Sequence, residues 1–307
     1  MAQVSTPEVE HPLDPLTAPE IELTTEILEA HDEVTDDVGF YSYQPVEPPK
    51  DELSEWEDGD PVDREVTAVL RDFAERETYE AVVSLSEEEI VSWEHLPDAI
   101  PHIPDMDVRE AEAAIIEDEA FRDAARERGV EDFEHVIVDP WPVNASEFVP
   151  DGLEEHRLAR GLAWVGRDEK DNAYSRPLEG IHAFIDLDEM EVLEVVDNGV
   201  VDEDSPLPPD RADFRADRVD ARDGREHLDV VQPEGVSWEV DGREVEWQKW
   251  SFRVGWTDRE GLVLHDITYD DDGEERKILH RMSASAMAVP YGDTDPNHSW
   301  KNALDIG

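Results

Sequence analysis

The sequence contains no cysteine, and only five of its 26 basic residues are lysine. Without cysteine the chain has no disulfides, no thiolate metal sites and no cysteine nucleophile. Its first residues, MAQVSTPEVEHPLD, lack the basic start and apolar stretch of a signal peptide, and no apolar run approaches the length that spans a membrane. We therefore expect a cytoplasmic protein with no membrane partner.

Basic residues are scarce relative to acidic ones: 82 Asp and Glu give a net charge of −56, and the acids occur in every segment of the chain. Nucleic-acid binding requires a basic surface, so it is not expected here. An acidic mimic of nucleic acid would need a concentrated stripe of charge, which the sequence does not have. The even distribution is typical of a halophilic, acidic proteome, where molar salt shortens the Debye length to about 3 Å.

The length and apolar content are sufficient for two or three compact units, since the chain has 307 residues, 38% of them hydrophobic, and nine Trp. Thr17 to Glu20 has the form of a capping box, with a proline in the first helical turn. It predicts a helix through His31 whose buried stripe is Ile21, Leu23, Ile27 and Leu28. After it we expect a strand at 39–44, a Pro- and acid-rich loop at 45–61, and strands at 62–73 and 78–85.

The next hundred residues repeat this pattern. A helix is predicted from Asp107 to a C-terminal Gly129, followed by strands at 133–138, 157–165 and 180–187. The sequence AFIDLDEMEVLEV at 183–195 aligns with AVVSLSEEEIVSW at 81–93 at one constant offset. The two stretches indicate two copies of one helix-plus-antiparallel-sheet unit. For this reason Ile90 to Glu94 is predicted to be a strand, although SEEE before it could cap a helix.

The last third of the chain has an all-β pattern. Residues 206–223 (PLPPDRADFRADRVDARD) read as a linker, because they are rich in Pro and charge and lack periodicity. Beyond the linker, apolar residues alternate on both sides of the turn sequences at Asp241-Gly242 and Asp272-Gly273. At least four antiparallel strands are expected there.

Four stretches resemble the copper- and topaquinone-dependent primary-amine oxidases. They are QPEGVSWEV (232–240), WQKWSFRVGWTDREGLVLHDITYDDDG (247–273), RMSASAMAVPYGD (281–293) and the terminal MAVPYGDTDPNHSWKNALDIG (287–307). The resemblance extends back to HPLDPLT at His11. It implies an α+β fold, in which two tandem small helix-plus-antiparallel-sheet (cystatin-like) domains precede the opening strands of a large β-sandwich.

The resemblance also implies domain bounds. They are 11–104 for an N2-like domain, 105–210 for an N3-like domain, and 211–307 for an incomplete start of the catalytic sandwich. The chain is thus expected to be the amino-terminal half of a longer enzyme.

Residues with a function in the family can be placed on this sequence one by one. Asp305 corresponds to the base that removes the α-proton of the substrate, and Tyr291 to the tyrosine that hydrogen-bonds a ring oxygen of the cofactor. Ala303 stands where many members carry an aromatic gate, so the family's gating is in doubt here. Pro140, Trp141 and Tyr174 fall where the second small domain lines the substrate channel. A Pro-aromatic turn that packs the domain edge explains the Pro-Trp pair equally well.

The family's cofactor residues are not among these 307. Eleven His occur with no H-x-H pair and no helical i, i+4 pair, which gives a metal site little support. Family members hold copper with three His, two of them as H-x-H, and form topaquinone from a Tyr that follows Asn. No Asn-Tyr dipeptide occurs in this sequence. Copper and topaquinone are therefore expected in the complete enzyme, and neither is expected to be bound by this chain alone.

The function implied is oxidation of a primary amine to an aldehyde, with release of ammonia and hydrogen peroxide. The partners implied are the amine substrate, a missing C-terminal catalytic half and, in the complete enzyme, a second copy as a homodimer. A different class of function stays open: a non-catalytic product of a truncated or split gene that acts as a structural partner of a separate catalytic half.

Overall fold

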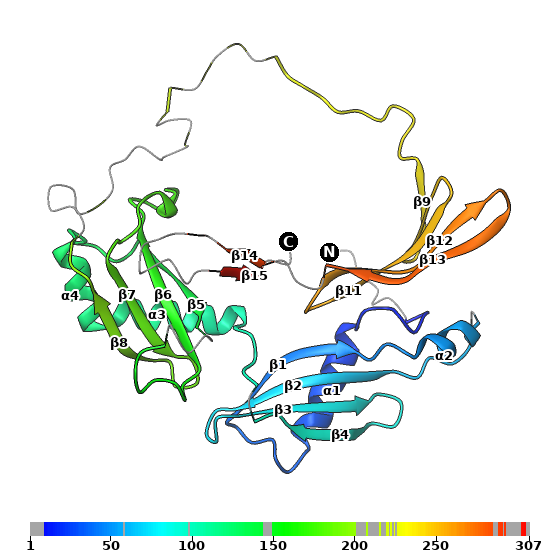
Figure 1. The fold of residues 1–307 in the computed structure, drawn as a ribbon, viewed down its shortest axis with the longest axis horizontal. Helices are drawn as coiled ribbons and strands as arrows, with labels where there is room; N and C mark the ends of the chain where they lie inside the picture. Colours follow the sequence, from blue (N-terminus) through cyan, green and yellow to red (C-terminus); the bar gives the residue numbers. More distant parts are fainter. Residues whose placement is uncertain are drawn as a thin grey trace. The chain divides into compact units, whose positions relative to one another are not determined.

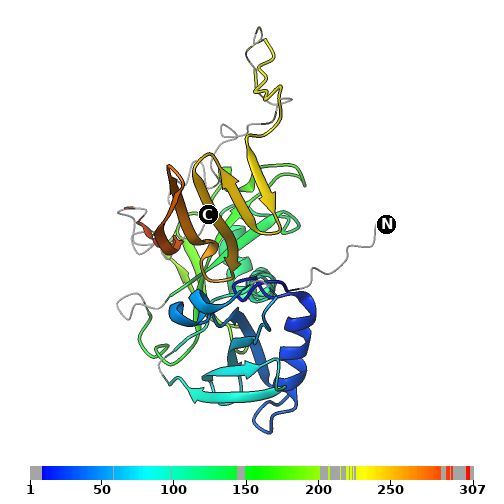
Figure 2. The same cartoon turned by 90° about the vertical axis from the view of Figure 1, so that its right-hand side faces the viewer.

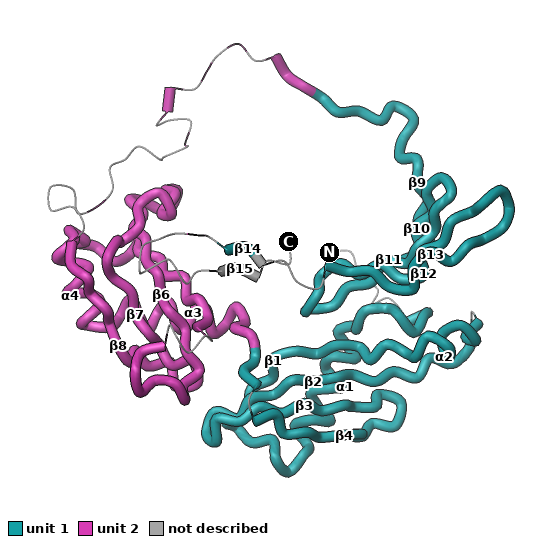
Figure 3. The backbone as a smooth tube through the Cα atoms, viewed as in Figure 1, with its two compact units in different colours: residues 1–101, 229–290, 302–307 teal, residues 102–228, 291–301 magenta. Residues whose placement is uncertain are grey.

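The computed structural model describes most of the chain. The described residues are 9–57, 59–97, 99–143, 149–200, 207, 215, 219–220, 222, 224, 226–284, 288–290, 292 and 302–304. Two compact units divide the chain (Figure 3): the first contains residues 1–101, 229–290 and 302–307, and the second contains 102–228 and 291–301. The three domains expected at 11–104, 105–210 and 211–307 stay a prediction. Among the helices described here, none is long and apolar enough to cross a membrane.

The first unit begins with a helix and a four-stranded antiparallel sheet (Figure 1). Its elements are α1 (Ala18–Glu29), β1 (Val38–Pro45), α2 (Lys50–Glu55), β2 (Glu65–Asp72), β3 (Glu77–Ser84) and β4 (Glu89–His95). The strands pair in the order β1-β2-β3-β4, and α1 packs along one face of the sheet (Figure 2). The core between helix and sheet is formed by Leu28, Ala68, Leu70, Ala81 and Val83.

The capping box predicted at the start of α1 is present. The Glu20 carboxylate accepts hydrogen bonds from the Thr17 backbone N–H at 2.8 Å and from its hydroxyl at 2.9 Å. Glu20 also accepts from the Arg64 guanidinium at 2.8 Å, which ties the helix start to β2. The predicted buried stripe is wrong at Ile21, which is 39% exposed, because the helix face toward the sheet passes through Thr24 and Leu28 instead.

The loop predicted at 45–61 contains one helical element, α2, which begins directly after Pro49. Its six residues span fewer than two turns, so they are too short to give a visible hydrophobic period. Leu53 is the one buried residue of α2. A short helix therefore lies where composition alone predicted irregular structure.

The second unit repeats the arrangement of the first small domain. Its elements are α3 (Asp105–Glu117), α4 (Glu119–Glu127), β5 (Val136–Pro142), β6 (Leu158–Val165), the 3₁₀ turn η2 (Ala173–Ser175), β7 (Ile181–Asp186) and β8 (Glu191–Asp197). The strands pair in the order β5-β6-β7-β8. The helices cover one face, where Ala111, Ile115 and Phe121 pack on Val138 and Ala183.

The single helix predicted from Asp107 to Gly129 is wrong, because the chain breaks at Asp118. This residue is extended (φ −64°, ψ 132°), and its carboxylate caps α4 by accepting from the Phe121 N–H at 2.8 Å. The second helix does end where expected, with Gly129 at φ 89°. Just before that glycine, the buried Arg128 donates to Asp197 at 2.6 Å and so fastens the end of α4 to β8.

The predicted repeat is confirmed in its details. The bulge between Val82 and Val83 in the β3–β4 pair recurs between Phe184 and Ile185 in the β7–β8 pair. Glu88 and Met190, at the same offset, both have positive φ, at 53° and 52°. The strand predicted at 90–94 is β4. Both copies therefore close with a hairpin of the same geometry.

Residues 229–290 add a five-stranded antiparallel sheet to the first unit, which confirms the all-β prediction. Its strands are β9 (Trp238–Asp241), β10 (Glu244–Trp247), β11 (Trp250–Thr257), β12 (Gly261–Asp271) and β13 (Glu274–Ser283), in consecutive order. A two-stranded ribbon of β14 (Ala288–Pro290) and β15 (Asn302–Leu304) follows. Most of the predicted linker 206–223 lies outside the described residues. The α+β class predicted from the sequence is confirmed.

One face of the β9–β13 sheet meets the first small domain through a row of basic side chains. Arg253, His265 and Arg281 are direct cross-strand neighbours on β11, β12 and β13, and we call them the basic row. Arg253 donates to Asp14 at 2.9 Å, and Arg281 donates to Glu47 at 2.9 Å. Two ion pairs thus join segments more than 230 residues apart in the sequence.

Candidate functional site

The two predicted catalytic residues, Asp305 and Tyr291, lie outside the described residues. The nearest described elements are β14 and β15, which pair antiparallel so that Ala303 stands opposite Val289. Gly292 has a positive φ of 66°, a backbone conformation that favours glycine. The geometry of the predicted base and cofactor contact therefore stays a prediction.

Pro140 and Trp141 lie in β5, at the edge of the second unit's sheet. The predicted strand at 133–138 is displaced, since β5 runs from Val136 to Pro142 and includes both residues. An edge strand accepts proline because its outward N–H needs no partner in the sheet. The alternative of a Pro-aromatic turn is wrong, since Pro140 and Trp141 pair with Gly161 and Arg160 of β6.

The third predicted channel residue, Tyr174, belongs to the turn η2 and reaches β5. Its hydroxyl donates to Asp139 at 3.1 Å, and its ring meets Trp164 edge-on at 5.1 Å between centroids. Trp141 packs against the same cluster as Trp164. Tyr174 is 57% exposed, and partial burial together with the Asp139 charge raises the pKa of its phenol.

The structure therefore brings together Trp141 and Tyr174 with two residues that sequence reasoning missed, Asp139 and Trp164. We call these four residues the aromatic patch. They lie on the sheet face opposite α3 and α4, because Val136 and Val138 of β5 point to the helices while the alternate residues do not. The period-2 alternation of LARGLAWV, which puts Trp164 on the same face as Leu162, was the signal that could have found Trp164.

An ion-pair cluster holds the loop that carries Tyr174. Asp171 accepts from Arg167 at 2.7 and 2.8 Å and from the Arg167 backbone N–H at 2.9 Å, and Arg176 lies 3.6 Å away. These donors hold the pKa of Asp171 far below its ordinary value. The ionised carboxylate therefore links Arg167 and Arg176, which stand on either side of Tyr174 in the sequence.

A row of buried and half-buried polar side chains continues along the same sheet face. Arg160 of β6 donates to a ring nitrogen of His182 on β7 at 2.7 Å, and its guanidinium lies 5.4 Å from the centre of the Phe184 ring. His156 and Asp186 form a second pair at 2.6 Å.

The aromatic patch with Asp139 can accept an organic cation, since aromatic faces and a carboxylate both attract positive charge.

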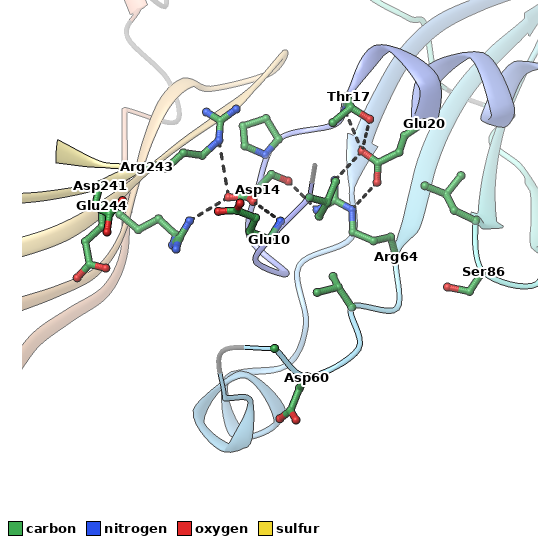
Figure 4. A pocket seen from close by; sticks show the side chains of 17 residues that line it. Glu10, Asp14, Thr17, Glu20, Asp60, Arg64, Ser86, Asp241, Arg243 and Glu244 are labelled. Atoms are coloured by element: carbon green, nitrogen blue, oxygen red, sulfur yellow. Dashed lines mark hydrogen bonds and ion pairs between the residues drawn. The ribbon is translucent and has the colours of Figure 1, made fainter. Parts of the chain in front are cut away.

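A pocket of about 1220 Å³ lies in the first unit, and we call it the hollow (Figure 4). Its wall includes Asp14 and Glu20, but each carboxylate is engaged: Asp14 by Arg253 and Glu20 by Arg64. Arg243 lies 3.7 Å from Asp14 as well. These contacts fix the chain before α1 to β2 and β11. The ion pairs of Asp14 and Glu20 in the wall of the hollow therefore have a structural role.

The described residues do not fit a copper site. Copper requires several nitrogen or sulfur ligands around one point, and no group of three or more His, Cys, Asp or Glu gathers anywhere in the described part of the chain. His265 of the basic row is buried, but the acid next to it is the single Glu47, at 3.9 Å.

Comparison with known proteins gives the same family for each part of the chain. Three family models match: the AGAO-like N2 domain at residues 17–93, the copper amine oxidase N3 domain at 106–217, and the copper amine oxidase enzyme domain at 239–307. The sequence is 38% identical over 302 residues to a primary amine oxidase of Arthrobacter sp. (strain P1), which covers 97% of this chain and 45% of that protein.

Two further relatives extend the comparison. A peroxisomal copper-containing diamine oxidase of Nicotiana tabacum is 39% identical over 228 residues, covering 71% of this chain and 28% of that protein. The structure of a copper-containing benzylamine oxidase from Hansenula polymorpha superposes with a TM-score of 0.80 at 24% identity, over 97% of this chain and 48% of that one. The chain thus spans less than half the length of the relatives it matches.

Proposed function

Because the chain belongs to the copper amine oxidase family, we propose that it forms part of a primary-amine oxidase. The reaction is the conversion of a primary amine, oxygen and water to an aldehyde, ammonia and hydrogen peroxide. The observation that carries this proposal is the match of all three domains, in order, to one family. The complete enzyme uses copper and topaquinone, which together supply the carbonyl and redox chemistry.

Asp305 is proposed as the general base that takes the α-proton of the substrate, with Tyr291 as a hydrogen-bond donor at the cofactor. A base must lie within hydrogen-bonding range of the proton that it removes, and a carboxylate in a dry site has its pKa raised toward neutrality. Ala303 is proposed to leave the entrance wide, since its methyl group replaces a ring. These roles rest on the family resemblance of VPYGD and ALDIG.

The aromatic patch is proposed as one wall of the substrate channel. Pro140 fixes the edge strand beside Trp141, and the Asp171 ion pairs hold the loop of Tyr174. Both supports make the wall rigid. A rigid wall orients an entering amine without a cost in side-chain entropy.

The free face of the β9–β13 sheet supports the view that further strands complete the enzyme domain. The face opposite the basic row carries a cross-strand row of aromatic residues: Trp238, Trp247, Trp250 and Tyr269. Trp256 and Leu262, also a cross-strand pair, are 57% and 58% exposed. An apolar face of this extent requires a cover. We propose that the rest of the catalytic sandwich provides it, along with the copper ligands and the cofactor tyrosine.

This chain by itself is proposed to be inactive, because the sequence has neither an Asn-Tyr dipeptide nor an H-x-H pair. The same fact favours the second candidate function, a structural partner of a separate catalytic half. The two candidates differ in whether residues of this chain take part in chemistry. The homodimer and the cytoplasmic location stay proposals.

Complementation tests the proposal. The chain is co-expressed in high salt with the remaining C-terminal part of the Arthrobacter primary amine oxidase, and amine-dependent hydrogen peroxide is measured with copper present. Peroxide from the pair, and none from either part alone, is expected. A complex that forms and contains the cofactor but never oxidises an amine would leave the structural role as the better account.

A further inference from the structure

A small cavity lies between α2 and the β12–β13 hairpin, inside the first compact unit. Its volume is about 110 Å³. Lys50 from α2 and Lys277 and His280 from β13 line it, with Asp266 of β12 beside them. Pockets for organic ligands measure about 300–1,000 Å³, so this cavity can hold a small ion but not a cofactor.

Among the residues that the structure describes, the two lysines at this cavity have no carboxylate partner. Neither the Lys50 nor the Lys277 ammonium forms an ion pair or side-chain hydrogen bond with any residue for which the structure gives a position. The chain has 82 acidic residues and only five lysines. Lys249, by contrast, reaches Asp272 at 3.0 Å on the same sheet. A cavity wall that carries two lysines and one acid, Asp266, therefore departs locally from the negative charge of the chain.

The one acid in the wall is already engaged. Asp266 has a φ of 44°, in a bulge of β12, and its carboxylate lies 3.5 Å from Nδ1 of His280. That contact orients the imidazole through Nδ1, so Nε2 is the ring nitrogen that Asp266 does not contact. Bulges re-aim side chains at the edges of functional sites. Asp266 therefore has a partner within the wall, and the two lysines are the charged groups of the wall that have no described partner.

We propose that this cavity binds a small oxyanion, with the Lys50 and Lys277 ammonium groups as its donors and the His280 ring as a third contact. The ligand class is phosphate or a compact carboxylate. Charge-assisted hydrogen bonds from two ammonium groups fit either one. The anion joins α2 of the small domain to β13 of the sheet, so its binding stabilises that contact.

Isothermal titration of the full chain with inorganic phosphate, at constant ionic strength, tests the site. One saturable site is expected, and Lys50→Gln and Lys277→Gln should each weaken binding about tenfold or more, since each removes a charged donor. Lys249→Gln, whose lysine already pairs with Asp272, is the matched control and should bind as the parent does. Absence of saturable binding, or equal loss in the control, overturns the proposal.

Parallel titrations identify the ligand. Tighter binding of phosphate and sulfate than of acetate assigns the phosphate class, and the reverse order assigns a carboxylate. Chloride that binds as tightly as either oxyanion contradicts the proposal, because two ammonium donors and an imidazole are then only a nonspecific positive patch.

Chemical protection gives a readout that needs no variant. Lysine acetylation followed by mass spectrometry compares Lys50 and Lys277 with Lys170, with and without phosphate. Slower acetylation of the two cavity lysines, and no change at Lys170, is expected. Uniform protection of all three lysines refutes the assignment.

Discussion

Removing the Arg281 guanidinium is expected to loosen the contact between the β9–β13 sheet and the first small domain. Its Nε donates to both Glu47 oxygens, at 2.9 and 3.0 Å, and its Nη1 donates to Glu260 at 2.8 Å. Arg281 and Glu47 are 30% and 27% exposed, and Glu260 is 13% exposed. The two carboxylates hold the pKa of Arg281 above its ordinary value, so it is charged at any pH.

The expected loss lies between two known cases. An exposed ion pair contributes about 0–1 kcal/mol, and breaking a buried pair costs about 3–5 kcal/mol. The Arg281 network is partly buried, so Arg281→Met should lower the free energy of unfolding by about 2 kcal/mol. Its coupling energy with Glu47 should be about 1 kcal/mol, since the two residues share two hydrogen bonds.

A double-mutant cycle in urea measures both quantities. It uses Arg281→Met, Glu47→Gln and the double variant, all in the same high salt. The matched control is Arg276→Met: Arg276 pairs with Asp271 in an exposed position of the same hairpin, so its loss should stay within about 0.5 kcal/mol. A coupling energy below about 0.3 kcal/mol, or an equal loss in the control, would refute the idea that this ion pair fastens the two parts.

Three other outcomes are expected. Gly161→Ala should cost about 1–3 kcal/mol in urea unfolding, because the added Cβ comes within 2.5 Å of Ile115 and 2.8 Å of Val138; a neutral result would contradict the packing of α3 on β6. Burial lowers the pKa of His265 below 6.5, and the Arg281 contacts lower the pKa of Glu260 to about 2. The free energy of unfolding should therefore fall as the pH drops below 6.5, and fall again from about pH 4.5 toward pH 2. His265→Gln should flatten the first of these two steps, and an unchanged pH profile would contradict this role for His265. In the complemented enzyme, Tyr174→Phe should change the KM for amines by less than about threefold, since the ring remains. Trp141→Ala should raise the KM about tenfold. A larger effect of Tyr174→Phe than of Trp141→Ala would argue against a channel wall formed by aromatic rings.

Most strands were predictable because they gave a period-2 pattern next to a turn sequence. The repeat was visible too, since a constant offset between 81–93 and 183–195 places the same bulge and the same positive-φ residue in both hairpins. The break at Asp118 was not visible. In the sequence, an Asp that caps a second helix looks the same as an Asp on the surface of one long helix. Only the packing of Phe121 into the core decides between one helix and two.

The long-range ion pairs could not be predicted from the sequence either. The chain has 82 acidic residues, and no sequence pattern identifies Asp14 as the partner of Arg253 or Glu47 as the partner of Arg281. The same limit applies to the aromatic patch. Trp141 and Tyr174 were named through the family resemblance, whereas Asp139 and Trp164 join them through the register of β5 on β6 and the fold of the loop at η2.

The proposed amine oxidation depends on proton abstraction by Asp305, and a pair of Asp→Asn variants isolates this step. Asp305→Asn and the control Asp293→Asn are each assembled with the complementing C-terminal part, and the rate of aldehyde formation is measured at saturating amine. We expect Asp305→Asn to lower the rate by about 10² to 10⁴, the usual contribution of a general base, while cofactor content and the control stay at the parental level. Parental activity in Asp305→Asn, with the cofactor formed, would contradict it.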